Sequence, residues 1–374
     1  MQPIRLALVT HNVMTGDGQG RVNYEIARYA LKRGAQVTLL ADRVAPELLE
    51  AGAEWCAVHP RVQRPDLAKV PEFIWRADQV LKTHAGEFDV VCGNGCVLSR
   101  PHKINCAHFV HGAWLRSPVH PFRVRRDWYG AYQLLYTMVN ARAERAVFNR
   151  AEAVVAVSEK VKDELISIGV PESKIHAIPN GIDVVEFQPG HTERQPFGLP
   201  PDQVIAVFVG DLRTPRKNLD TVLKAIAQVP EVHLAVVGNT SGSLYPRMAE
   251  MMNLNGRVHF LGYRADVAKI MRAADVFVFP SRYDPYPLVV LEAMASGLPV
   301  ITARSVGAAT LVTRECGYVL DDPEDIDGLV AALQELAGDP ERRRRMGQAA
   351  RRVAEPHSWE RMAAAYWKLF ETVR

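Results

Sequence analysis

The sequence predicts an α/β protein built from two doubly wound domains, and three observations carry this prediction. The chain has 374 residues, and at roughly 100–200 residues per domain this length favours two domains. A strand, a glycine-containing loop, a helix and a second strand fit within residues 4–40, an order typical of a doubly wound sheet. The alternation of strands and helices restarts after residues 188–201, a Pro- and Gly-rich stretch that we expect to be the interdomain linker.

The first half is expected to form a parallel sheet covered on both faces. Residues 4–10 are a short apolar run, and Gly34 ends the helix that follows the glycine-containing loop. Further apolar runs alternate with helical stretches, as in parallel sheets. The expected strands are 4–10, 36–40, 88–92, 104–110, 153–157 and 174–178.

The second half repeats this pattern and adds a helical C-terminus. Its expected strands are 204–210, 233–238, 258–262, 276–280 and 299–302. Its expected helices are 218–228, 267–274, 288–296, 326–336 and 340–353, followed by an amphipathic stretch from Trp359 to Phe370. Two such units predict a deep ligand-binding cleft where the C-terminal strand ends of both sheets face each other.

The composition excludes several classes of protein. Apolar residues make up 48% and charged residues 23%, so a disordered, collagen-like or coiled-coil chain is excluded. The formal net charge of +3 is too small for a dedicated nucleic-acid-binding protein, and we expect no nucleic-acid partner. The five cysteines lack metal-binding spacing, so we expect reduced thiols and no zinc.

We expect a cytoplasmic protein. No apolar run approaches the ~18 residues of a transmembrane helix. The N-terminal residues lead directly into a strand, without the segments of a signal peptide.

Glycines at the first strand–helix junction indicate a phosphate or sugar contact. Gly16, Gly18 and Gly20 would let the backbone approach a phosphate, and a helix N-terminus favours anions. The dinucleotide fingerprint needs glycine where Arg21 stands, although Asp42 lies where a ribose-binding acid would fall. An NAD site and a plain tight turn are therefore the alternatives.

A histidine is expected at a strand end. His111 follows the predicted strand 104–110, so it is a candidate substrate contact or proton carrier. Strand alternation predicts that His108 points to the opposite face from His111. A structural histidine is the alternative.

Three cations lie in a short loop at the start of the second domain. Arg213, Arg216 and Lys217 follow strand 204–210 and precede a helix. Arginine suits bidentate phosphate contacts, and lysine supplies a point charge. The loop therefore predicts phosphate binding, with a solvated basic loop as the alternative.

Two acids flank the start of a later helix. Asp284 lies in a loop after strand 276–280, Pro287 suits the first helical turn, and Glu292 lies about one turn further on. Carboxylates near a helix N-terminus suit hydroxyl-rich ligands. The acidic segment 324–327 is expected to cap a helix far from these motifs.

Together these motifs resemble retaining glycosyltransferase family 4, which has the GT-B fold of two Rossmann-like domains. The string from Asp284 to Glu292 resembles its E-x7-E signature, and Gly210 to Asn218 resembles its phosphate-binding loop. Residues 178–183 (IPNGID), 258–263 and 358–360 resemble further family segments. The resemblance implies an acceptor domain at 1–187, a linker at 188–201, a donor domain at 202–356, and a C-terminal helix, 357–374, that packs on the first domain.

The resemblance implies transfer of a hexose with retention of configuration and without a metal or other cofactor. The donor would be a nucleotide sugar, with UDP-glucose as our first choice. His111 would contact the donor sugar or assist at the reacting centre. Arg216 and Lys217 would clamp the diphosphate, and Asp284 would hold sugar hydroxyls.

Further residues are implied in donor binding. Glu292 would hold the ribose, the backbone at Tyr263 and Arg264 would meet the base, and Gly18 and Gly20 would lie near the diphosphate. The remaining implied donor contacts are Gly210, Arg213, Tyr286, Leu288 and Val289.

The sequence departs from the family pattern at several positions. The first acid is Asp284 instead of glutamate, and Pro285 and Pro287 remove backbone donors. Residues 307–311 lack the family's acid, and Asp211 stands where arginine is common. These departures leave the donor sugar and base open.

A basic, aromatic segment in the first domain predicts contact with an acceptor or a membrane. Residues 100–150 carry nine basic and two acidic residues. Residues 114–129 mix four arginines with aromatics, a composition that suits anionic lipid headgroups or an acidic, lipid-linked acceptor. We therefore expect a glycan or lipid-linked acceptor in envelope or exopolysaccharide synthesis, with peripheral contact to the inner face of the membrane. The alternatives are a GT-B epimerase or phosphorylase, an idle sugar-binding protein, and an NAD-dependent oxidoreductase.

Overall fold

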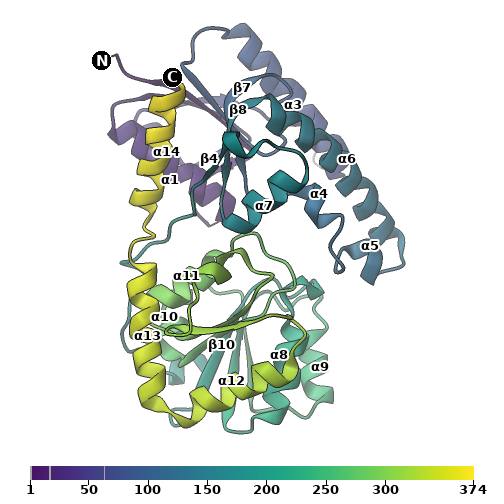
Figure 1. Cartoon of the computed structure of the whole chain (residues 1–374), viewed down its shortest axis with the longest axis vertical. Helices are drawn as coiled ribbons and strands as arrows, with labels where there is room; N and C mark the ends of the chain where they lie inside the picture. Colours follow the sequence, from purple (N-terminus) through teal and green to yellow (C-terminus); the bar gives the residue numbers. More distant parts are fainter. Residues whose placement is uncertain (1, 17, 63) are drawn as a thin grey trace. The chain divides into compact units, whose positions relative to one another are not determined.

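The chain folds into two compact α/β units, shown in Figure 1 of the computed structural model. Residues 2–16, 18–62 and 64–374 are described. The first unit comprises Met1–Gly181 and Trp359–Arg374, and the second comprises Ile182–Ser358.

The first unit is built on a parallel sheet that is covered by helices. Its strands run in the order β5 (Glu54–Ala57), β3 (Gln36–Ala41), β1 (Arg5–Val9), β6 (Val90–Asn94), β7 (His102–Ala107), β8 (Ala151–Ala156) and β9 (Ile175–Ala177). Its longer helices are α1 (Gly18–Lys32), α3 (Asp66–Thr83), α6 (Trp128–Arg150), α7 (Glu159–Ser167) and α14 (Trp359–Val373). Its shorter elements are α2 (Pro46–Glu50), α4 (His111–Trp114), α5 (Pro121–Val124), η1 (Glu172–Lys174), and the paired strands β2 (Asn12–Val13) and β4 (Arg43–Val44).

The C-terminal helix belongs to the first unit. In Figure 1, α14 lies beside α1. The Arg21 guanidinium lies 5.6 Å from the Trp359 ring centre, and the Arg33 guanidinium lies 5.8 Å from that of Trp367. These cation–π contacts add to the apolar packing of α14 on the first unit.

The second unit repeats the parallel architecture. Its strand order is β12 (Val258–Gly262), β11 (Val232–Val237), β10 (Val204–Val209), β13 (Val276–Phe279), β14 (Val300–Ala303) and β15 (Gly317–Leu320). Its helices are α8 (Leu219–Gln228), α9 (Tyr245–Met251), α10 (Val267–Ala273), α11 (Leu288–Ala295), α12 (Ile326–Gly338) and α13 (Pro340–Ala354). Its 3₁₀ turns are η2 (Gln195–Phe197), η3 (Pro215–Lys217) and η4 (Gly307–Leu311).

Each sheet reverses its strand order at one point. In the first unit the reversal falls between β1 and β6, and in the second it falls between β10 and β13. Doubly wound sheets bind ligands outside the carboxyl ends of the two strands at such a point. The fold therefore marks one ligand-binding position in each unit.

The predicted fold class is confirmed, while several local expectations were wrong. The strand predicted at 104–110 ends at Ala107, so His111 begins the short helix α4 instead of ending a strand. The strands β5 and β15 and the long helices α3 and α6 were not predicted. The division between the units falls after Gly181. The stretch 188–201, predicted as a linker, packs on the second unit through Arg194, which pairs with Asp275 at 2.7 Å.

Candidate functional site

The basic loop of the second unit lies at the strand reversal and faces an acid. Lys217 ends the turn η3 and forms an ion pair with Asp284, which follows β13. The two side chains are only 13% and 8% exposed. Arg216 Nη1 donates to the Tyr283 carbonyl oxygen over 3.4 Å. The structure thus brings together three of the predicted catalytic residues.

The surroundings of Lys217 favour an anionic ligand. Burial lowers the pKa of Lys217, and the Asp284 carboxylate opposes part of that fall. The Lys217 ammonium also lies 5.2 Å from the centre of the Phe279 ring. A desolvated ammonium interacts more strongly with a nearby negative charge than an exposed one does. An arriving diphosphate would compete with Asp284 for this cation.

Asn218 fixes the exit of the basic loop. Its backbone is left-handed at φ 64°, a conformation that asparagine tolerates better than most residues. Its side-chain amide donates to the carbonyl oxygens of Pro280 and Pro323 over 2.9 and 2.6 Å. The first bond joins the basic loop to the segment that carries Asp284, and the second joins it to the loop between β15 and α12.

Arg282 supports the same loop, and the sequence did not reveal it. Its Nη1 donates to the Pro215 carbonyl oxygen over 2.6 Å, and its backbone N–H donates to the Arg216 carbonyl oxygen over 2.9 Å. Asp220 and Glu324 both pair with its guanidinium. The expectation that segment 324–327 lies far from the motifs was therefore wrong for Glu324. The predicted cap is confirmed for Asp325, which accepts a bond from the Gly328 N–H.

The helix α11 begins at Leu288, four residues after Asp284, so its N-terminus lies near the basic loop. Pro287 precedes the helix, and Leu288 and Val289 form its half-buried first turn. The first backbone N–H groups of a helix have no partner within it, so they favour an anion. The Tyr286 hydroxyl is buried and has no hydrogen-bond partner among the described residues. Burial raises the pKa of this phenol.

Glu292 lies on α11 in an environment that favours its neutral form. Burial, together with the negative charge of Glu186, raises the pKa of Glu292 to about 8. A protonated carboxyl group can donate as well as accept a hydrogen bond. Glu292 can therefore serve a hydroxyl pair such as that of a ribose.

The other predicted donor contacts of the second unit are less tightly tied to the loop. Arg213 is exposed and pairs with Asp211 at 2.9 Å. Arg264 pairs with Asp266 at 2.7 Å, and Tyr263 is 77% exposed. Gly210 follows β10, and an added Cβ there would meet only ordinary contacts. Space alone therefore does not require glycine at that position.

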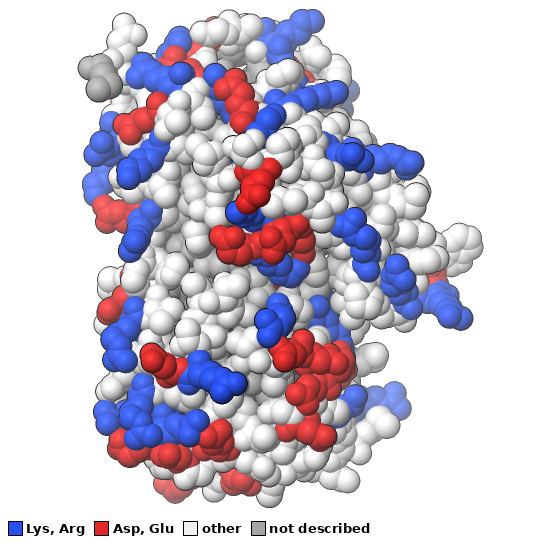
Figure 2. All heavy atoms as spheres, in the orientation of Figure 1, with Lys and Arg blue, Asp and Glu red and all other residues white. Residues whose placement is uncertain are grey.

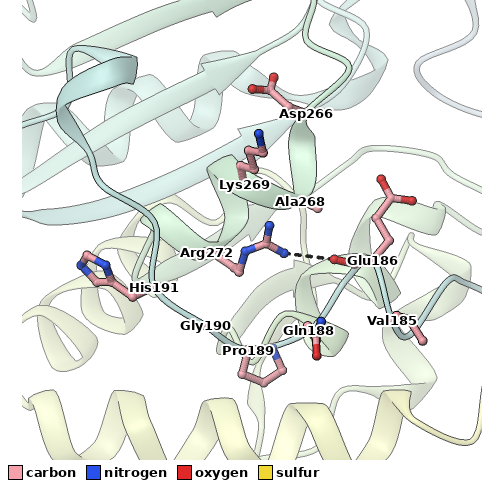
Figure 3. A pocket seen from close by; sticks show the side chains of 10 residues that line it. All are labelled: Val185, Glu186, Gln188, Pro189, Gly190, His191, Asp266, Ala268, Lys269 and Arg272. Carbon is pink, nitrogen blue, oxygen red and sulfur yellow. Dashed lines mark hydrogen bonds between the residues drawn. The ribbon is translucent and has the colours of Figure 1, made fainter.

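A separate open pocket of about 590 Å³ lies between residues 185–191 and α10 (Figure 3). Arg272 Nη1 donates to the Glu186 carbonyl oxygen across it over 3.0 Å. Lys269 and Asp266 lie next to one another at the start of α10. This pocket is lined by none of the predicted site residues.

His111 begins α4 after β7 and is held by a buried acid. One Glu144 oxygen accepts from the His111 N–H over 2.8 Å and contacts Nδ1 at 3.1 Å. The other accepts from the Gly112 N–H over 2.6 Å. A proton on Nδ1 that bonds to Glu144 leaves Nε2 as an acceptor. The sequence offered no signal for Glu144, which lies 33 residues away on α6.

Two further expectations about the first unit were wrong. His108 and His111 line the same cavity, because β7 ends before either residue and strand alternation does not apply. Trp114, assigned to the basic aromatic surface, is buried. Gly18 begins α1 and Gly20 lies in its first turn, while Asp17 lies outside the described residues.

The acid proposed for an NAD ribose is already engaged. Asp42 contacts His59 Nδ1 at 2.8 Å and Lys69 Nζ at 3.8 Å.

In the described ranges, no group of three or more His, Cys, Asp or Glu side chains is placed to hold a metal ion. No helix within those ranges is long and apolar enough to cross a membrane.

Comparison with known proteins connects both units to one enzyme family. Residues 16–186 match the family model described as Glycosyltransferase Family 4, and residues 191–353 match Glycosyl transferases group 1. MMP alpha-(1->4)-mannosyltransferase from Mycolicibacterium hassiacum is 27% identical, with 98% of each chain covered. D-inositol 3-phosphate glycosyltransferase from Mycobacterium tuberculosis is 33% identical, over 58% of this chain and 48% of the relative.

Solved structures show the same fold. Sucrose-phosphate synthase from Thermosynechococcus elongatus superposes with a TM-score of 0.79 at 22% identity, with 99% of each chain covered. Anabaena HepE in complex with UDP and glucose superposes with a TM-score of 0.75 at 21% identity, over 99% of this chain and all of that one. The two units therefore form a GT-B fold.

Proposed function

Because the chain belongs to glycosyltransferase family 4, we propose that it transfers a hexose from a nucleoside diphosphate sugar to a hydroxyl acceptor, with retention of configuration. The observation that carries this proposal is the half-buried pair of cations, Arg216 and Lys217, near the N-terminus of α11. Both features lie where the sheet of the second unit reverses its order, the usual ligand position in such folds.

The proposed site stabilises the leaving group. Cleavage of the bond between C1 of the sugar and the phosphate oxygen places negative charge on the departing diphosphate. Arg216, Lys217 and the first N–H groups of α11 are fixed opposite charges for it. Removal of one such group typically costs about 3–4 kcal/mol of barrier.

Retention is proposed to occur by a same-face reaction instead of through a covalent intermediate on Asp284. Asp284 is tied to Lys217 and almost fully buried, so it is poorly placed to attack C1. In a same-face reaction the acceptor oxygen bonds to C1 as the phosphate oxygen leaves with the electron pair. The acceptor proton then passes to the departing diphosphate. Asp284 is left to bind sugar hydroxyls.

UDP-glucose remains the first donor to test, and GDP-mannose is its competitor. HepE was crystallised with UDP and glucose, which supports UDP in a fold of this type. The mycolicibacterial relative is named as a mannosyltransferase. Glu292 and the exposed segment at Tyr263 would contact ribose and base, and neither side chain excludes one of the two nucleotides.

The test is donor turnover by the full chain. Release of UDP or GDP is measured from each nucleotide sugar, with a panel of glycosides and lipid-linked sugars as acceptors. The anomeric configuration of the product is read by NMR. The proposal predicts release from one donor class and an α-linked product from an α-linked donor. Four results would contradict the proposal. They are a product with inverted configuration, a sugar phosphate formed with inorganic phosphate, an epimerised donor, and donor binding without turnover.

We also propose that α5 and the start of α6 place the enzyme on the anionic inner face of a membrane, where a lipid-linked acceptor would lie. Trp128 is 92% exposed, and Phe122, Tyr129 and Leu135 are also exposed. Figure 2 shows basic side chains along the edge where α5 and α6 lie. Exposed aromatics among arginines suit an anionic lipid surface.

Flotation with vesicles tests this surface. Binding to phosphatidylglycerol vesicles should exceed binding to phosphatidylcholine vesicles and fall as salt rises. The variant Trp128→Ala should weaken it, whereas Trp75→Ala, at another exposed tryptophan, should not. Equal flotation of both variants, or none for the wild type, would contradict the proposal.

A further inference from the structure

A small cavity in the first unit, lined by apolar and polar side chains, lies where that sheet reverses its order. Its volume is about 180 Å³, equivalent to roughly six waters at about 30 Å³ each. His11 follows β1, and Asn94 ends β6, so both flank the reversal. The cavity has room for one small ring and is smaller than the pockets that hold drug-sized ligands.

Several uncharged side-chain amides lie in or beside the cavity wall. Gln19 Nε2 donates to Asn94 Oδ1 over 2.6 Å, and Asn94 Nδ2 donates to Asn23 Oδ1 over 2.8 Å. Asn140 is anchored by a bond of 2.8 Å from its amide to the Tyr136 carbonyl oxygen. These bonds orient the amides on the cavity wall. Oriented neutral amides suit a ligand with several hydroxyl groups.

One buried nitrogen in the wall has no partner. His11 Nδ1 is buried and unbonded among the described residues. Burial lowers the pKa of His11 to about 4, so the ring is neutral at physiological pH. Its ring packs on Phe73, with centroids 4.2 Å apart. A buried polar atom without a partner is costly, and a ligand hydroxyl would satisfy it.

The charge of the lining disfavours an anionic ligand. The described residues that line the cavity include no lysine or arginine, and Glu144 contributes a buried carboxylate. The positive charge of Lys69 helps to lower the pKa of His11. The Lys69 ammonium is paired with the Asp42 carboxylate at 3.8 Å. A phosphate placed here would be desolvated beside a carboxylate and without a cation.

We propose that this cavity receives an uncharged polyhydroxyl ring of the acceptor and rejects its phosphorylated counterpart. The inference rests on the proposed function and names the acceptor class of that reaction. His111 Nε2, left as an acceptor by the Glu144 contact at Nδ1, would accept a bond from a hydroxyl of this ring. The amides and His11 would hold the others.

The experiment compares matched pairs of probes by saturation-transfer NMR on the full chain. The pairs are myo-inositol with myo-inositol 3-phosphate and methyl α-D-glucoside with glucose 6-phosphate. The neutral member of at least one pair should bind at least tenfold more tightly than its phosphate. Equal or tighter binding of the phosphates, or no binding of either neutral probe, would overturn the inference.

A variant ties the binding to this cavity. His11→Phe keeps a ring against Phe73 and removes the unpartnered nitrogen, so it should weaken the neutral probe about tenfold. His84→Phe is the matched control, because His84 also lies beside a phenylalanine ring, that of Phe88, and should not change binding. Unchanged binding in His11→Phe would overturn the assignment.

UDP binding, measured separately, distinguishes failure of this inference from failure of the proposed function. If UDP and GDP do not bind while a neutral probe does, the transferase proposal fails, and only the preference of the cavity for a neutral polyhydroxyl ring stands. If a nucleotide binds and only phosphorylated probes enter the cavity, the assignment fails alone.

Discussion

Replacing Lys217 by methionine should separate the stability role of this residue from its role in binding. The change leaves the Asp284 carboxylate, 8% exposed, without its partner. Breaking a buried ion pair on one side costs about 3–5 kcal/mol. At about 2–4 °C per kcal/mol for a domain of this size, the Tm should fall by roughly 6–20 °C. UDP affinity should fall roughly 10–200-fold, because one charge-assisted contact is lost.

The double variant Lys217→Met/Asp284→Asn decides between the two roles. It removes both charges, so much of the lost Tm should return. UDP affinity should stay low, because the cation is still missing and Asp284 is assigned to the sugar instead of the diphosphate. Tm is measured by calorimetry and UDP affinity by titration.

The control for this pair is Lys224→Met, at an exposed lysine on α8, which should change the unfolding free energy by less than about 0.5 kcal/mol. If the double variant regains UDP affinity together with stability, the pair is structural and the assignment of Lys217 to the diphosphate is refuted.

Three further predictions concern other residues in the two units. The pKa of Glu292 is raised from its ordinary value of 4.5 to about 8. Between these two pH values the folded state binds a proton that the unfolded state has lost. The free energy of unfolding should therefore fall as the pH rises from 4.5 to 8. Tm scans across that range should be flatter for Glu292→Gln, and equal slopes would contradict the prediction. In Glu144→Gln, one carbonyl oxygen cannot accept all three bonds that the carboxylate accepts from His111 and Gly112. The kcat should therefore fall at least about tenfold, while UDP affinity is unchanged. Steady-state kinetics and titration check this, and an equal loss of kcat and UDP affinity would indicate misfolding. Gly238→Ala would place Cβ 2.2 Å from the Gly210 carbonyl oxygen, so the Tm should fall as expected for about 1–3 kcal/mol of overpacking, and an unchanged Tm would show that β11 can shift.

The fold could be predicted because its strands are local apolar runs. Val204–Val209 and Val276–Phe279 are almost entirely buried, so their apolar character shows directly in the sequence. Arg216, Lys217 and Asp284 could be predicted for a related reason. They follow such strands, and the carboxyl ends of neighbouring parallel strands lie at the same edge of a sheet.

The supporting residues could not be predicted because their partners are distant in the chain. Glu144 lies inside the long helix α6, and its contact with His111 depends on how α4 packs against α6. Arg282 resembles any surface arginine until folding places Asp220 and Glu324 on either side of it. His111 was assigned to a strand because residues 104–110 continue to be apolar beyond the end of pairing at Ala107.

The most direct test of the central claim is a calorimetric titration of the full chain with UDP, GDP, ADP and NAD, repeated on Arg216→Ala. The account predicts that at least one nucleoside diphosphate binds and that the variant weakens it by tenfold or more. Binding of NAD alone, unchanged in Arg216→Ala, would contradict the account and assign the glycine loop of the first unit to a dinucleotide.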